Sequence, residues 1–420
     1  MRTTLFALAL LSLSSSLAHA DNWLHWRGPT GNGTSPTATP PIAWSATQNI
    51  KWKVAIPGQG SGSPVIWEDR VFVVTGAPAV DGAGGDLPKL NFDLICLDRE
   101  TGKELWKRTA TTAIPHQGTH STNNFASASP CTDGTHVYAH FGSRGLYCYT
   151  IDGELKWSRT DFEKMTTRNG FGEGSSPTIA GNKILVPWDH EGQSAFYALD
   201  KLTGKTIWEV KRDEPTEWST PLVLEADTGM QVVLNGQNFA RSYDLETGKE
   251  LWRCSGQTNR PVASAVKHKN LVIVGSGFQG SFMAAFKLNG RGDIKGTDSV
   301  VWSIDRDTPD IASPLLTNGR VYFYKGKSGV LSCVNAETGE TIFAASRIPG
   351  IQSTYASPVA AGGHIYLTDR SGTIVVIRDS GELQIVSSNN LGEGVDATPA
   401  PVDNQLFVRG ANHLFCIANE

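Results

Sequence analysis

Residues 176–210 read SPTIAGNKILVPWDHEGQSAFYALDKLTGKTIWEV, and this stretch decides the fold. It contains four short runs of alternating apolar residues, at 176–179, 183–187, 195–200 and 205–210, separated by turns rich in Gly, Asn and Asp. Alternation with a period of two residues, bounded by such turns, is typical of antiparallel hairpins. The stretch therefore predicts four consecutive antiparallel strands.

Two features of this stretch recur along the chain. A Ser or Thr, usually followed by Pro, opens the first strand, and a Thr-Gly-Lys-x-x-Trp step opens the fourth. The first feature recurs at Ser63, Ser129, Ser176, Thr220, Ser264, Ser313, Ser357 and Thr398. The Trp residues of the fourth strands are Trp52, Trp106, Trp157, Trp208, Trp252 and Trp302. A repeat of this period is typical of radially arranged four-stranded blades, and we expect each Trp to dock its blade on the next.

The two ends of the repeat array set the number of blades. Eight first-strand openings occur, but the last repeat ends after its third strand at 414–417. The missing fourth strand, with its Trp, stands at the other end of the array, at 50–54. Pairing the two ends removes the exposed strand edges. The sequence therefore predicts an all-β, eight-bladed β-propeller over residues 50–420, closed by an N-terminal strand.

The residues before the propeller suggest an export signal. Arg2, an apolar run over 5–17 and Ala18-His19-Ala20 match the three parts of a cleavable signal peptide at 1–20. Residues 21–49 are rich in Pro, Thr and Gly, and we expect an extended segment laid across the propeller. We find no later apolar run of transmembrane length. We expect a periplasmic or secreted monomer, and the net charge of −4 argues against nucleic acid as a partner.

The six cysteines are expected to be free. Cys96, Cys148 and Cys333 occupy one repeat position, five or six residues before the turn Gly, and Ala198 and Ser242 occupy it in other repeats. A position that accepts Cys, Ala or Ser is a small buried slot in a strand, where an unpaired Cys behaves as a small hydrophobe.

The blade motif resembles the pyrroloquinoline-quinone (PQQ) type of repeat. This repeat is shared by the quinoprotein alcohol dehydrogenases and by the propeller lipoprotein of the outer-membrane β-barrel assembly machinery. The opening Trp23-Leu24-His25-Trp26-Arg27-Gly28-Pro29 is similar to that of exported, planctomycete-type propeller proteins named for the repeat. The resemblance implies a quinoprotein alcohol dehydrogenase-like propeller, but the repeat by itself does not imply the cofactor.

The dehydrogenase function would require a specific set of groups. The resemblance implies a vicinal Cys-Cys disulfide on the quinone, Ca²⁺ held by Glu, Asn and Asp, and an Asp as general base. The chain has no adjacent Cys pair, no Cys-x-x-Cys-His, no Gly-x-Ser-x-Gly and no His-Glu-x-x-His. The glycine-rich run at 58–62 precedes a strand and so does not match a phosphate loop. We predict no catalytic residue, metal or cofactor, with PQQ and Ca²⁺ as the alternative.

The long loops, which join each blade to the next and the second strand to the third, share one face of a propeller. They are chemically varied, and we expect the binding site on this long-loop face. The candidate residues are His116, His120, Asn123, Arg168, Asn169, Asp189, His190, Glu191, Trp218, Asn235, Arg260, Asp310 and Tyr355. The expected partner is another exported protein or a small ligand.

Two clusters of these candidates each have two interpretations. His116 and His120 with Asp189-His190-Glu191 have the residue types of a metal site, or they anchor loops through hydrogen bonds. Arg168, Arg260 and Trp218 suit an anionic or aromatic ligand, or the arginines form ion pairs between blades. We predict a non-catalytic binding or assembly scaffold, and the alternative is a PQQ-dependent oxidoreductase of reduced type.

Overall fold

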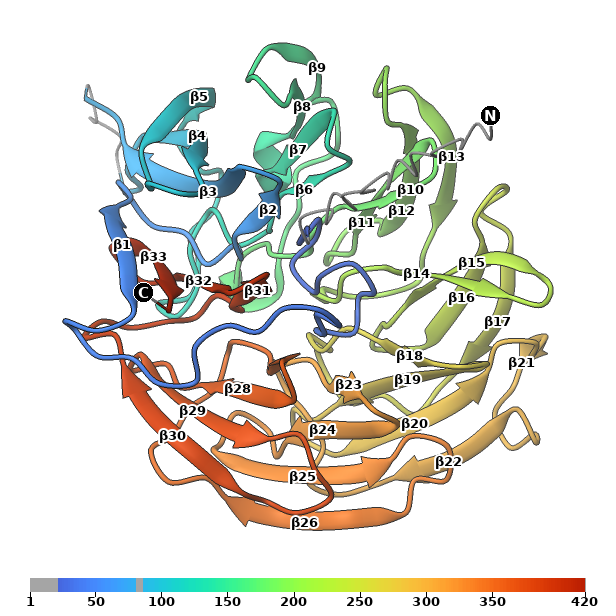
Figure 1. Cartoon of the computed structure of the whole chain (residues 1–420). Helices are drawn as coiled ribbons and strands as arrows, with labels where there is room; N and C mark the ends of the chain where they lie inside the picture. The colour runs from blue at the N-terminus through green and yellow to red at the C-terminus, as the bar shows by residue number, and fades with distance from the viewer. Residues whose placement is uncertain (1–21, 81–85, 420) are drawn as a thin grey trace, which may run out of the picture.

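The computed structural model describes residues 22–80 and 86–419, so the predicted signal peptide at 1–20 lies outside the described residues. These residues form eight β-sheets arranged around a central axis (Figure 1). Each sheet contains four consecutive antiparallel strands, except where the ring closes and where short insertions intervene. The predicted all-β, eight-bladed propeller is confirmed. Among the described residues no helix has the length and apolar character needed to cross a membrane.

The strands of the first four blades follow the chain. They are β2 (Val65–Trp67), β3 (Arg70–Pro78), β4 (Leu90–Asp98) and β5 (Glu104–Ala113) in blade 1; β6 (Cys131–Thr132), β7 (His136–His140), β8 (Leu146–Thr150) and β9 (Leu155–Arg159) in blade 2; β10 (Thr178–Ala180), β11 (Lys183–Trp188), β12 (Ala195–Asp200) and β13 (Thr206–Lys211) in blade 3; and β14 (Leu222–Ala226), β15 (Gly229–Leu234), β16 (Ala240–Asp244) and β17 (Glu250–Cys254) in blade 4. A short strand from blade 5, β21 (Gly292–Asp293), pairs in parallel with β17.

The remaining blades complete the ring. They comprise β18 (Val266–His268), β19 (Leu271–Ser276), β20 (Phe282–Lys287) and β22 (Val300–Ile304) in blade 5; β23 (Leu315–Thr317), β24 (Arg320–Tyr324), β25 (Val330–Asn335) and β26 (Thr341–Arg347) in blade 6; β27 (Val359–Ala361), β28 (His364–Thr368), β29 (Thr373–Arg378) and β30 (Ile385–Asn390) in blade 7; and β31 (Ala400–Val402), β32 (Gln405–Arg409), β33 (His413–Ala418) and β1 (Ile50–Ala55) in blade 8.

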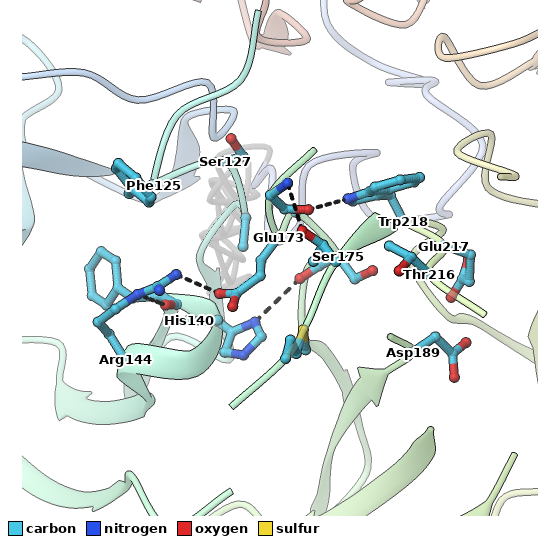
Figure 2. Close-up of a pocket in the computed structure, with 17 residues that line it drawn as sticks. Phe125, Ser127, His140, Arg144, Glu173, Ser175, Asp189, Thr216, Glu217 and Trp218 are labelled. Carbon is cyan, nitrogen blue, oxygen red and sulfur yellow. Dashed lines mark hydrogen bonds and ion pairs between the residues drawn. The ribbon is translucent and has the colours of Figure 1, made fainter. Parts of the chain in front are cut away.

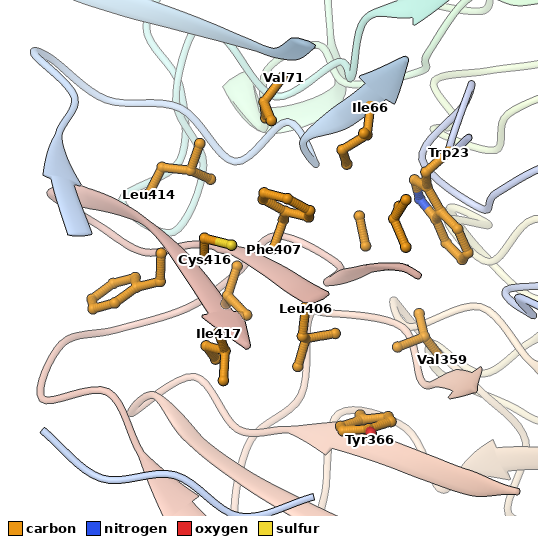
Figure 3. Packing of buried hydrophobic residues seen from close by; sticks show 14 of the residues in the cluster. Trp23, Ile66, Val71, Val359, Tyr366, Leu406, Phe407, Leu414, Cys416 and Ile417 are labelled. Carbon is orange, nitrogen blue, oxygen red and sulfur yellow. The ribbon is translucent and has the colours of Figure 1, made fainter. Parts of the chain in front are cut away.

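Blade 8 joins the two ends of the chain. β1 pairs antiparallel with β33, which places Trp52 opposite Cys416. The side chains of blade 8 pack with those of blades 1 and 7 in one buried apolar cluster, in which Phe407 and Leu414 are fully buried (Figure 3). Trp23, from the segment before β1, belongs to the same cluster. Apolar burial between blades therefore holds the ring closed.

A second closed ring is made of hydrogen bonds. In every blade the backbone N–H of the Ser or Thr before the first strand donates to the side-chain hydroxyl of the equivalent residue in the next blade, at 2.8–3.2 Å. The circuit runs through Ser63, Ser129, Ser176, Thr220, Ser264, Ser313, Ser357, Thr398 and back to Ser63. We call it the hydroxyl ring. The repeated Ser or Thr thus satisfies a buried amide of the neighbouring blade.

The fourth-strand Trp residues lie against the Thr-Gly turn of the following blade. The Trp208 indole lies over Gly248, where an added Cβ would come within 2.8 Å of the ring, and its Nε1 donates to Leu245 O at 3.0 Å. The same indole-to-carbonyl bond recurs for Trp52, Trp106, Trp157 and Trp302. Trp252 differs, because the insertion carrying β21 replaces the turn in blade 5, and it packs instead on Phe286 and Ile294.

The small slot opposite these indoles explains the cysteines. Cys148 is paired across the strands with Trp157, and Ala198 with Trp208. A larger side chain at this position would compete with the indole for space. All six cysteines are free and buried.

Residues 22–49 run across the ends of the first strands, at the side of the short turns (Figure 1). Trp23 pairs with Ile66 of blade 1, and Ser35 N donates to Ala360 O of blade 7 at 2.9 Å. The Arg27 guanidinium donates to Pro358 O at 2.8 Å and Pro314 O at 2.5 Å. This N-terminal segment therefore spans the channel at the short-turn end.

Candidate functional site

A cavity of about 400 Å³ occupies the channel on the long-loop side. Seven hydroxyl-ring residues line it, together with Trp26 of the N-terminal segment. The remaining wall comes from long loops and contains His120, Asn123, Phe171, Trp218, Arg260, Phe278, Lys327, Tyr355 and Asp396. Its volume lies within the range of ligand pockets. We refer to it as the channel cavity.

Arg260 is the most constrained residue of the channel cavity. Its Cζ lies 3.5 Å from the centroid of the Phe278 ring and 5.6 Å from that of Phe171. Its Nη2 contacts the Asp310 carboxylate at 3.3 Å, and burial raises the pKa of Asp310. The backbone of Arg260 has φ +46°, which a non-glycine residue adopts only when its surroundings enforce it. The loop therefore holds this guanidinium in one place on the wall.

Gln237 connects Arg260 to Arg168. The Gln237 Oε1 accepts from the Arg260 backbone N–H and from Arg168 Nη1, both at 3.1 Å. Arg168 also pairs with Glu191 at 3.3 Å, and the next residue, Asn169, has φ +51°. The structure thus gathers the two predicted arginines at one site, although only Arg260 lines the channel cavity.

Trp218 completes this part of the wall. Its Nε1 donates to Gly172 O at 2.7 Å, and its ring meets Phe171 edge to face at 6.2 Å between centroids. His120, another predicted residue, lies against the same phenylalanine, with 5.2 Å between its ring centroid and that of Phe171. The wall therefore presents fixed aromatic surfaces beside the Arg260 guanidinium, an arrangement that suits a ligand with apolar and anionic parts.

The predicted His and Asp cluster is dispersed. His116 Nε2 bonds to Met165 O at 2.7 Å, and the His190 ring accepts from the backbone N–H of Thr166 at 3.3 Å. The Asp189 carboxylate forms an ion pair with Arg212. Within residues 22–80 and 86–419, no three His, Cys, Asp or Glu side chains converge as metal ligands would. These hydrogen bonds and this ion pair hold the long loops in place.

A buried ion pair lies beneath the long loops. Arg212 Nε contacts both Asp189 carboxylate oxygens, at 2.8 and 3.0 Å, and neither side chain is exposed. Glu217 accepts from Ser219 N at 2.7 Å. Burial, and then the charge of Asp189, raises the pKa of Glu217 well above its ordinary value of 4.5. Glu217 therefore keeps its proton to a higher pH than an exposed glutamate does.

A small pocket of about 20 Å³ adjoins this pair and the channel cavity (Figure 2). The Glu173 carboxylate turns toward Arg144 at 2.5 Å across it, and His140 Nδ1 bonds to Ser175 O at 3.3 Å. Burial lowers the pKa of His140 to about 4, so this imidazole is neutral at pH 7. The pocket has room for about one water molecule, so it is a structural void rather than a ligand site.

Three further predicted residues act as loop anchors. Tyr355 Oη donates to Thr122 Oγ1 at 3.0 Å across the mouth of the channel cavity, and Asn123 Nδ2 donates to Phe171 O at 2.8 Å. Asn235 is buried and donates to Gly275 O at 3.1 Å. Of the predicted residues, those that line the channel cavity are His120, Asn123, Trp218, Arg260 and Tyr355.

The prediction missed the aromatic and hydroxyl parts of the wall. Phe171 and Phe278 stand in loops, where a phenylalanine carries less indication of a binding role than a charged or polar side chain does. The hydroxyl ring was visible as a repeat and was interpreted only as a strand signal. Trp26 comes from a segment whose position along the channel no local pattern specifies.

Comparisons with known proteins agree with this architecture. A family model described as outer membrane protein assembly factor BamB matches residues 37–160, 90–290 and 240–419. The chain is 24% identical over 169 residues to the outer membrane protein assembly factor BamB of Francisella salina, covering 40% of this chain and 30% of that protein. It is 32% identical over 122 residues to the lanthanide-dependent methanol dehydrogenase of Methylacidiphilum fumariolicum (strain SolV), covering 27% and 19%.

These matches span less than a third of the length of either curated relative. Among solved structures, the quinohemoprotein alcohol dehydrogenase of Comamonas testosteroni superposes with a TM-score of 0.65 at 10% identity, over 97% of this chain and 82% of that one. At this identity the superposition supports the fold alone. The relatives thus include both an assembly factor and a dehydrogenase on one scaffold.

Proposed function

This chain belongs to the outer membrane protein assembly factor BamB family, and from that premise we propose that it is an exported, non-catalytic binding scaffold. It binds another exported protein or a small ligand through the long-loop face, as a monomer. One observation carries the proposal. The channel cavity of about 400 Å³ is walled by the long loops, whereas the N-terminal segment spans the opposite end of the channel.

The construction of the wall supports a binding role. Arg260 is held by strained backbone, two aromatic rings and one carboxylate, and Trp218 is fixed by its indole hydrogen bond. Rigid aromatic and Arg side chains at the centre of a recessed surface are typical of residues that dominate binding energy. Because they are already ordered, a ligand would lose little side-chain entropy on binding.

Two acidic residues, Asp396 in the wall of the channel cavity and Asp310 behind Arg260, support a non-catalytic role. Asp310 contacts Arg260, and Asp396 forms a two-point ion pair with Arg370 at 2.6 and 3.0 Å. A quinone site of the dehydrogenase type would need carboxylates free to hold Ca²⁺ and one free to act as a base. The residues that line this cavity do not fit that requirement, so we propose no cofactor and derive no redox step.

A cross-linking comparison tests the binding role. The purified protein is cross-linked in an envelope extract of its source, and the adducts are compared with those of an Arg260→Ala/Trp218→Ala variant. Asn182→Ala, an exposed change in a short turn of the opposite face, is the matched control. We expect specific adducts to be lost in the double variant and kept in the control. An unchanged adduct pattern in a correctly folded double variant would refute binding through this wall.

The second candidate function is a PQQ-dependent oxidoreductase of reduced type, which the 32% identity to a methanol dehydrogenase favours. Incubation with PQQ and either Ca²⁺ or a lanthanide, followed by dye reduction with alcohols and sugars, separates the two functions. We expect no turnover above that of the cofactor alone. Cofactor-dependent turnover that disappears in Arg260→Ala would establish the enzyme and overturn the non-catalytic role.

A further inference from the structure

Arg409 is a buried cation that has no hydrogen-bond partner among residues 22–80 and 86–419. It ends β32 in blade 8 and is 1% exposed. Within the described part of the chain, its Nε, Nη1 and Nη2 atoms make no hydrogen bond. Burial lowers the pKa of this guanidinium to about 10, so it is still charged at pH 7. Removing an unpaired charge from water is costly, and buried arginines are normally paired.

Arg409 is one of the residues around a polar cavity of about 370 Å³ between blades 7, 8 and 1 on the long-loop face. We call it the Arg409 pocket. Besides Arg409, its wall includes Gly60, Ser121, Asn124, Arg370 and Asn412. The glycine-rich run at 58–62, which did not match a phosphate loop, thus contributes to this wall. Hydroxyl and amide groups predominate, and no aromatic side chain lines it.

The acidic groups near Arg409 are engaged elsewhere. The Asp396 carboxylate is held by Arg370 through two hydrogen bonds. Glu393 bonds to His413 Nδ1 at 2.6 Å and accepts from the backbone N–H groups of Asn412 and His413 at 3.0 and 2.9 Å. Its charge acts on Arg409 without a hydrogen bond between them. Within the described residues, no group of the wall therefore hydrogen-bonds the Arg409 guanidinium, and the Glu393 carboxylate acts on it only through its charge.

The glycines of the wall have a structural explanation. A Cβ on Gly60 would come within 2.6 Å of Val74 O, so the absence of a side chain lets this turn approach β3. They do not by themselves mark a ligand site. The guanidinium without a hydrogen bond remains the feature that packing does not explain. Its five N–H donors on a planar fork match a carboxylate or phosphate.

We propose that the Arg409 pocket binds a small polar oxyanion, with a carboxylate or phosphate on Arg409 and a hydroxylated body against the Ser, Thr and Asn side chains. A sugar acid or a sugar phosphate has this chemistry. The pocket adjoins the channel cavity, with which it shares Ser61, Thr122, Asn123 and Asp396. The anion site stands independently of any scaffold role, because Arg409 does not line the channel cavity.

Calorimetric titration of the whole protein tests the proposal. The probes are sodium gluconate, inorganic phosphate and acetate, each at constant ionic strength set with sodium chloride. We expect gluconate and phosphate to bind, and acetate to bind more weakly than gluconate because it lacks the hydroxyl groups. Arg409→Met is expected to weaken binding about tenfold or more, as loss of a charge-assisted hydrogen bond predicts. Arg347→Met, at an exposed position, serves as the control and is expected to bind as the wild type does.

Thermal unfolding without added anion separates a ligand site from a structural role. An unpaired buried charge destabilises the empty protein, so Arg409→Met is expected to melt at a higher temperature than the wild type. Arg409→Lys, which keeps the charge and loses the fork, is expected to bind less tightly than the wild type. Equal binding by wild type and Arg409→Met, binding of none of the probes by the wild type, or a lowered melting temperature of Arg409→Met would each overturn the proposal.

Discussion

Substitution of one hydroxyl-ring residue should destabilise the whole propeller. In Ser313→Ala the methyl group cannot accept the Ser264 N–H, which now bonds to Ser313 Oγ at 2.8 Å. Both residues are almost fully buried, at 2% and 5% exposure, so water does not replace the lost partner. An unsatisfied buried donor costs about 1–3 kcal/mol. The Ser313 backbone N–H keeps its own acceptor, Ser357, so the effect isolates one bond of the ring.

Urea unfolding followed by tryptophan fluorescence measures this effect. We expect Ser313→Ala to lower the unfolding free energy by about 1–3 kcal/mol at unchanged m-value. Ser313→Thr retains a hydroxyl, as the ring positions Thr220 and Thr398 do, and is expected to stay close to the wild type. Ser303→Ala, at an exposed position of β22, controls for the loss of a serine. If the Ala and Thr variants of residue 313 were equally stable, the reasoning about the ring would be refuted.

Four further substitutions test three other features, each feature with its own measurement. Trp208→Phe loses the bond to Leu245 O and part of the buried indole, so it should cost more than the about 0.5–1.5 kcal/mol of one hydrogen bond in urea unfolding. Gly248→Ala should also destabilise, because of its φ of +72° and the clash with Trp208. The raised pKa of Glu217 stabilises the fold below pH 4.5, and this stabilisation is lost as pH rises through the folded-state pKa. Glu217→Gln removes the titrating group, so the melting temperature of this variant should decline less between low and neutral pH than that of the wild type. Arg27→Met loses the two hydrogen bonds to carbonyl groups that hold the N-terminal segment, so proteolysis within residues 22–45 should become about tenfold faster or more. Mass spectrometry of the cleavage products measures this rate, and an unchanged rate would contradict the anchoring role of Arg27.

Much of the fold was predictable because the repeat is local. The strands expected at 183–187 and 195–200 are found at Lys183–Trp188 and Ala195–Asp200. Closure of the ring followed from a missing Trp strand at one end and a surplus one, containing Trp52, at the other. The hydroxyl ring was not predictable, because a Ser before a strand carries no sign that its side chain faces the next blade.

The candidate site was only partly predictable. Arg260 and Trp218 were identified because the long-loop face follows from propeller geometry, and residue type then selects the charged and aromatic groups. Asp189 and His190 do not line the channel cavity, because their loop turns them inward, where Asp189 forms an ion pair with Arg212. Arg409 gave no signal, since a charged residue at the end of a strand is ordinary and its lack of a partner depends on every neighbouring blade.

Ring closure has a kinetic consequence. Thr398 donates to Ser63 across 335 positions of sequence, and β1 waits for β33 before blade 8 exists. At about 5–20 residues per second of synthesis, β1 remains unpaired for tens of seconds after it is made. Contacts of such long range slow folding. Until blade 8 forms, β1 has an unpaired edge and the sides of blades 1 and 7 that pack on blade 8 stay uncovered. The time between synthesis of the first strand and synthesis of the last is therefore when this molecule is most exposed to misassembly with other chains.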